Sequence, residues 1–234
     1  MKTACFSLFT LVAVAACTDD SDPPWQLDHD RIIAVRATPP RIAAGDQAVV
    51  DMLVGFNGAP VAERSPDTLT VDSPASLVDA LGRDADRWVV TAPSAERLAA
   101  ARSELGLPAG APVPLKVRAG DAGHGLFALK TVWLGDSGTG ASNPAMTGIS
   151  INRFDPGDAE ITVAPLVDVP MSIGVSDVDH DVTWLSSCGT MHDFDLPSAY
   201  LRVENDDPKE GELVLVLRDA GGGVSWRRWP IHAE

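Results

Sequence analysis

Three aspartates in the second half of the chain have the spacing of a cation site. Asp177, Asp179 and Asp181 alternate with other residues in the segment SDVDHDVTW. Alternation through a turn gathers carboxylate oxygens around Ca²⁺, a hard cation that takes about 6 to 8 oxygen ligands. An EF-hand is excluded, because the required Gly and Glu of its loop are replaced by Val182 and Cys188. Calcium binding and a solvated acidic turn are the two interpretations of this segment.

Softer metal ligands follow shortly afterwards. Cys188 and His192, with His180 nearby, could bind zinc or copper. A cupredoxin-like copper site requires a methionine after the histidine, whereas Met191 precedes it. The three residues also lack the paired spacing of zinc sites. We therefore expect a buried thiol beside a loop histidine.

The segment 135–138 (GDSG) has the form of the nucleophile motif of trypsin-like proteases, which would make Ser137 the nucleophile. Such a serine requires a histidine base that an aspartate orients. The Ala-Ala-His-Cys context of that family is absent upstream. His124 lies in a glycine-rich turn and His29 near the N-terminus, so we expect neither to be positioned by a core. A flexible linker explains the glycines without catalysis.

Aromatic residues near the C-terminus are the remaining candidates for binding. Trp226 and Trp229 lie on one expected strand and point to opposite faces. One should lie in the core and the other on the surface or between domains. We consider carbohydrate stacking by Trp229 against the commoner role of tryptophan in apolar packing. Acidic pairs such as Asp193 and Asp195 do not indicate a glycosidase without a measured separation of their carboxyls.

The elements that must position these residues are mostly strands. In the segment 47–54, Ala48, Val50, Met52 and Val54 share one face, the period-2 pattern of a half-buried strand. Further short apolar runs are separated by Pro, Gly and Asp, at 32–37, 68–71, 88–91, 113–117 and 127–134. One helix is expected over 95–105, with Ser94 as its cap and Gly106 and Pro108 after its end. This density of strands predicts a sandwich with one inserted short helix.

A second set of strands follows a Gly-rich segment at 135–148, where we place a linker between domains. The expected strands are 149–152, 161–163, 173–176, 182–185, 200–203, 213–218 and 224–229. The run 213–217 is apolar on both faces, which predicts a central strand covered on each side by the neighbouring domain or the helix. The antibody-type Cys, Trp, Cys pattern is absent, and Trp184 alone is placed to be the core tryptophan of such a pattern. The sequence thus predicts an all-β protein of two tandem immunoglobulin-like β-sandwich domains, at 31–134 and 149–234.

Two segments of the second domain carry a resemblance. The Asp-rich turn 176–184 resembles the entry to a strand in bacterial cadherin-like and PKD-like repeats, and 213–224 is similar to their last hairpin. The resemblance covers roughly the last sixty residues. It implies a calcium role for Asp177, Asp179 and Asp181, together with Asp219. His180 stands where these repeats favour Gly.

The N-terminus has the features of an export signal. Lys2 is followed by an apolar stretch and by small residues, and 13 residues are too few to span a bilayer. The sequence Val14-Ala15-Ala16-Cys17 resembles a bacterial lipobox, which implies cleavage of residues 1–16 and acylation of Cys17. Several acyl chains give durable anchoring. Thr18 at the second position implies the outer membrane, and the acidic segment 17–30 reads as a tether.

Charge and cysteine content limit the remaining functions. Removal of Lys2 with the signal leaves 17 basic and 33 acidic residues, a net charge of −16, which disfavours nucleic acid as a partner. Cys188 is the one cysteine beside the anchor, so no internal disulfide framework is expected. We expect a non-enzymatic surface lipoprotein with a protein partner in the envelope. A calcium-dependent or sugar-binding module and an enzyme of unrecognised type are the alternatives.

Overall fold

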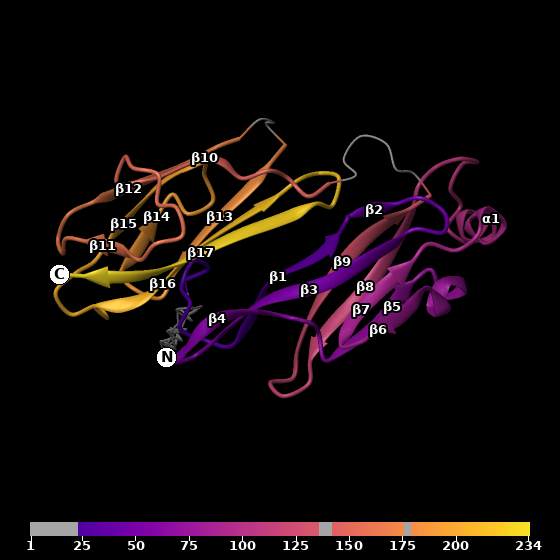
Figure 1. Ribbon diagram of the computed structural model, residues 1–234, viewed down its shortest axis with the longest axis horizontal. Coiled ribbons are helices and arrows are strands. Elements are labelled where there is room, and N and C mark those ends of the chain that lie inside the picture. The colour runs from indigo at the N-terminus through magenta and orange to yellow at the C-terminus, as the bar shows by residue number, and fades with distance from the viewer. Residues whose placement is uncertain (1–22, 136–141, 176–178) are drawn as a thin grey trace, which may run out of the picture.

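A computed structural model describes residues 23–135, 142–175 and 179–234. Within these residues the chain forms seventeen strands, one α-helix and one 3-10 helix. The strands make four sheets in two face-to-face pairs, and the strands of each pair are contiguous in sequence. Figure 1 shows the first pair in indigo to magenta and the second in orange to yellow. The predicted all-β class with tandem immunoglobulin-like sandwiches is confirmed.

The first sandwich contains strands β1 to β9. One sheet has the order β1-β3-β7-β6, with β4 also paired to β3, and the other has the order β2-β9-β8-β5. The strands are β1 (Arg31–Thr38), β2 (Arg41–Ile42), β3 (Gln47–Phe56), β4 (Ala59–Arg64), β5 (Thr68–Ser73), β6 (Leu81–Asp84), β7 (Arg87–Thr91), β8 (Val113–Asp121) and β9 (Leu126–Leu134). The residues predicted to share one face of β3, from Ala48 to Val54, are all buried in the core. Strands β2, β4 and β6 were not expected, because they are short or polar.

Helix α1 (Ala95–Glu104) covers one end of this sandwich, where Leu98 and Ala101 are buried. It begins after Ser94 as predicted, but the Ser94 side chain makes no capping hydrogen bond. The 3-10 helix η1 (Ala75–Ala80) was not predicted. Glu104 accepts hydrogen bonds from the backbone of η1 at Ala75, 3.0 Å away. The two short helices therefore pack together at the same end.

The second sandwich contains strands β10 to β17. Its sheets have the orders β10-β12-β15-β14 and β11-β17-β16-β13, with β11 parallel to β17. The strands are β10 (Thr147–Ile151), β11 (Ile161–Val163), β12 (Val169–Gly174), β13 (Asp181–Ser186), β14 (Thr190–His192), β15 (Ser198–Arg202), β16 (Glu210–Arg218) and β17 (Val224–Ala233). The strand expected at 173–176 instead begins at Val169, so that Val169, Met171 and Ile173 face the core. Trp184 is buried there as predicted, and its indole N–H donates to Leu196 O at 3.2 Å.

The two sandwiches share a third apolar cluster. Its buried members come from both: Leu27, Ile33, Ala34, Leu53, Val61, Leu185, Val214, Val216, Val224 and Trp226. On β16, Leu213, Leu215 and Leu217 face the core of the second sandwich, whereas Val214 and Val216 face this cluster. The prediction of a central strand covered on both faces is confirmed, and the cover comes from the neighbouring sandwich rather than from α1. Strands β1 and β4 lie beside β17 and β16 (Figure 1).

The described part of the N-terminal segment is bound to the junction. Leu27 N–H donates to Ser186 O and Ser186 N–H donates to Trp25 O, both at 3.0 Å, so Gln26 forms a parallel bridge with Ser186 on β13. Leu27 is buried in the shared cluster. The prediction that 17–30 is an acidic tether is therefore wrong for residues 25–27, because apolar side chains and an open strand edge were available to them. Among the described helices, none is long and apolar enough to cross a membrane.

Candidate functional site

The aspartates predicted to bind calcium are only partly described. Asp177 lies outside the described residues. Asp181 begins β13 with an exposed carboxylate 4.0 Å from Arg218 Nη1. The Asp219 carboxylate accepts a hydrogen bond from Gly223 N–H at 2.8 Å and so holds the turn between β16 and β17. No group of three or more His, Cys, Asp or Glu side chains suited to a metal ion occurs among the described residues, Asp179 included. Calcium binding stays a prediction.

The cysteine near His192 is a core residue. Cys188 is fully buried, and its Sγ donates to Pro208 O at 2.8 Å. Burial raises the pKa of the Cys188 thiol, which disfavours the thiolate that a metal requires. His192 stacks on Tyr200, with ring centres 4.3 Å apart. The interpretation of Cys188 as a buried thiol is confirmed.

Of the protease-motif serine Ser137 and the candidate base His124, only His124 lies among the described residues. His124 was expected to be unsupported, and this was wrong: its Nδ1 lies 3.1 Å from Asp121 Oδ1, and its ring stacks on Phe56 at 3.9 Å. Asp121 is itself buried and paired with Arg64. The carboxylate thus fixes the turn between β8 and β9, a contact that residue spacing did not reveal.

The two tryptophans of β17 lie on opposite faces of the strand, as predicted, and pack in different apolar clusters. Trp229 is 0% exposed in the core of the second sandwich, and its indole N–H donates to Gly157 O at 2.8 Å. The proposal that Trp229 stacks on a sugar is wrong, because its ring has no surface open to a ligand. Trp226 is 8% exposed and lies in the cluster between the sandwiches. Trp226 is therefore the tryptophan of this strand that packs between the sandwiches.

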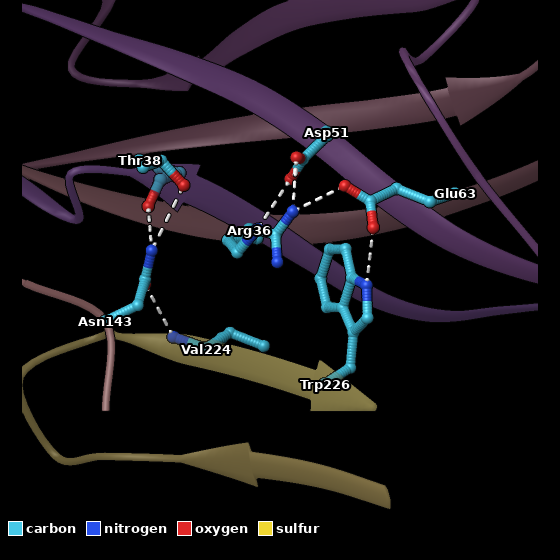
Figure 2. A network of polar contacts seen from close by, with 8 residues as sticks. Arg36, Thr38, Asp51, Glu63, Asn143, Val224 and Trp226 are labelled. Atoms are coloured by element: carbon cyan, nitrogen blue, oxygen red, sulfur yellow. Dashed lines mark hydrogen bonds and ion pairs between the residues drawn. The ribbon is translucent and has the colours of Figure 1, made fainter. Parts of the chain in front are cut away.

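A polar network surrounds Trp226 at the junction (Figure 2). Its indole N–H donates to Glu63 Oε2 at 2.9 Å, and the Arg36 guanidinium lies 3.8 Å from the ring centre. Arg36 donates to Asp51 at 2.7 and 3.1 Å and to Glu63 at 2.6 Å. Burial raises the pKa of Asp51, against the opposing effect of the Arg36 charge. The network joins β1, β3 and β4 of the first sandwich to β17 of the second.

Backbone groups extend this connection. Asn143 Nδ2 donates to Ala37 O and Thr38 Oγ1, both at 3.1 Å, and Asn143 Oδ1 accepts from Val224 N–H at 2.9 Å (Figure 2). Arg228 donates to Val61 O at 2.7 Å, and Arg218 donates to Ile33 O at 3.1 Å. Bonds that satisfy buried polar groups fix one geometry, because leaving any group unpaired is costly. The junction is therefore both apolar and specifically hydrogen-bonded.

Only part of this junction could be predicted from the sequence. The two-sided apolar run of β16 and the alternation of Trp226 with Trp229 both indicated an additional covered surface. Arg36, Asp51 and Glu63 gave no signal, because their meeting depends on the register in which β1 and β4 pair with β3.

No protein-family model and no curated protein sequence matches the chain. Among solved structures, tandem Ig repeats of Dlar are 9% identical with a TM-score of 0.30, covering 88% of this chain and 98% of that one. The protocadherin GammaB4 extracellular domain is 12% identical with a TM-score of 0.27, covering 88% and 33%. A nucleoside hydrolase-related protein from Saccharophagus degradans is 18% identical with a TM-score of 0.33; 43% of this chain matches, over 28% of that protein's length. At TM-scores this low, none of them assigns the chain a function.

Proposed function

We propose that the protein is a non-enzymatic, membrane-anchored lipoprotein of the cell envelope whose two sandwiches act as one rigid unit for binding another protein. The observation that carries this proposal is the third apolar cluster with Trp226 at the junction. Domains in one chain move relative to each other unless their interface is large and apolar. A junction with buried valines and hydrogen-bonded arginines supports a fixed spacing between the surfaces that the two sandwiches present.

A surface suited to a protein partner lies on the outer face of β8 and β9. Phe127 is 62% exposed, and the Arg118 guanidinium lies 4.7 Å from its ring centre. Gly120 pairs with Phe127 across the strands and leaves a hollow beside the ring, which Thr68 and Thr70 also line. Aromatic residues and arginine are enriched in protein interfaces, where they contribute most of the binding energy. We place the partner-binding surface at Phe127.

The position of the N-terminal segment bears on how the unit would be presented. The chain enters the junction at Trp25, which is bonded to Ser186. Pro23 lies six positions after Cys17, and an extended chain of six steps reaches about 20 Å. Acylation of Cys17 would then hold the junction, rather than the end of one sandwich, close to the outer membrane or cell surface.

Photo-crosslinking in cells that express the protein tests this function. A photoreactive residue in place of Phe127 should give one discrete protein adduct, whereas the same residue in place of Val78, which is equally exposed near α1, should not. Cys17→Ala should release the protein from membranes and abolish the adduct. Equal adducts from both positions would contradict the binding surface, and a Cys17→Ala protein that still partitions with membranes would contradict the anchor.

A further inference from the structure

A cleft of about 320 Å³ opens where the two sandwiches meet. One wall is β1 at 32–35, the other is β9 at 128–131, and the hairpin of β16 and β17 forms the base at 218–219 and 222–224. Small-ligand sites have volumes of about 300 to 1,000 Å³ and occur preferentially between domains. The cleft is large enough for a small organic molecule, and Phe127 is not among the residues that line it.

A buried lysine lies in this cleft. Lys130 is 7% exposed and projects from β9 on the same side as the core residue Val132. Its ammonium donates to Gly222 O, the one hydrogen bond that the described residues give it. An ammonium has three donors, and lysine is almost never buried without a charged partner. Two donors of Lys130 are therefore available to a ligand.

Two cationic side chains and one carboxylate line the cleft. Arg218 lines the same cleft and donates to two neutral groups, Thr183 Oγ1 and Ile33 O, while the carboxylate of Asp181, its cross-strand partner on β13, lies 4.0 Å from its Nη1. Asp219 is the one carboxylate that lines the cleft, and it accepts from Gly223 N–H. The side chains that line the cleft thus carry two positive charges and one negative charge, in a protein whose formal net charge is −15.

Burial has a measurable consequence for Lys130. Desolvation lowers its pKa from 10.5 to about 8, although Asp219 and Asp51 act to raise it and Arg218 adds to the lowering. The nearby carboxylates thus do not compensate for the loss of water. A bound anion would supply that compensation.

We propose that the cleft binds a small monocarboxylate, whose carboxylate accepts hydrogen bonds from Lys130 and Arg218 and whose apolar body packs against Ile32 and Ala128. Lys130 and Arg218 supply donors for one carboxylate, and the nearby carboxylates of Asp219, Asp181 and Asp51 oppose the second negative charge of a phosphate dianion. Apolar groups on both walls match a ligand with a hydrocarbon portion. This ligand site is separate from the proposed protein-binding surface, and either can fail without the other.

Calorimetric titration of the full chain with acetate, hexanoate and phenylacetate at constant ionic strength tests the proposal. Hexanoate or phenylacetate should bind saturably with a Kd on the order of 1 mM or tighter, and neutral hexanamide should not bind. Lys130→Met should lose at least about tenfold in affinity, whereas Lys116→Met, which removes an exposed lysine from neighbouring β8, should bind as the wild type does.

Three outcomes would overturn the proposal: equal binding of hexanamide, unchanged affinity in Lys130→Met, or tighter binding of inorganic phosphate than of any carboxylate. Because Lys130→Met could alter the junction, NMR of the Lys130 side chain in the wild-type protein supplies a second measurement. Hexanoate should raise the pKa of Lys130 above about 8, and an unchanged pKa at saturating ligand contradicts the site.

Discussion

Replacement of Lys130 by Met should stabilise the protein, although it removes a buried hydrogen bond. Lowering the pKa from 10.5 to about 8 corresponds to a cost of about 3 kcal/mol for holding the charged form in the folded state at pH 7. The lost bond to Gly222 O offsets about 1 kcal/mol of this gain. The methionine side chain is nearly as long as that of lysine and can occupy the space of the buried aliphatic part of Lys130. We expect Lys130→Met to raise the free energy of unfolding by about 2 kcal/mol.

The pH dependence of the unfolding free energy gives a second test of the Lys130 prediction. Between pH 8 and 10.5 the unfolded chain holds the Lys130 proton more tightly than the folded chain, so wild-type stability should rise with pH across that window. Lys130→Met should lack this rise, while Lys116→Met should keep it. Urea unfolding followed by tryptophan fluorescence at pH 7 and pH 10 measures both effects. A Lys130→Met protein that is less stable at pH 7, or that shows the wild-type pH slope, would refute the reasoning.

Three further predictions concern other positions in the two sandwiches. Trp226→Ala should cost about 3 to 5 kcal/mol and split a single calorimetric transition into two; one unchanged transition counts against the coupling of the sandwiches. Cys188 should react with a thiol reagent at least about 100-fold more slowly in the folded than in the unfolded protein, because burial raises its pKa; equal rates contradict its placement. Phe127→Ser should change unfolding free energy by less than about 0.5 kcal/mol, whereas Trp229→Ala should cost about 3 to 5; similar costs would contradict their assigned exposures.

The periodicity of apolar residues was sufficient to predict which side chains are buried wherever one face of an element packs against a core. The alternation in β3 correctly identified its inward residues, and α1 follows its apolar spacing closely. The two-sided apolar pattern of β16 correctly indicated cover on both faces. These features depend on local sequence, so a single segment was enough to predict them.

Contacts that join distant segments could not be predicted. The acidic, proline-containing start of the chain read as a tether, yet Trp25 and Leu27 bind the open edge of β13. Trp229 and Trp226 were correctly placed on opposite faces, but the sequence did not say which face is the core. Lys130 reads as an ordinary surface lysine in β9, and only the approach of the β16–β17 hairpin buries it. Each of these depends on how the sandwiches dock, which no single strand encodes.

The distance between spin labels on the two sandwiches tests most directly whether they form one rigid unit. Labels attached at cysteines introduced at exposed Asp86 and Asp195 place one reporter in each sandwich, and the native Cys188 is buried. Pulsed EPR should give one narrow distance distribution for the wild-type sequence and a broad one for Trp226→Ala. A broad distribution in the otherwise unaltered protein would contradict the rigid unit on which the proposed function depends.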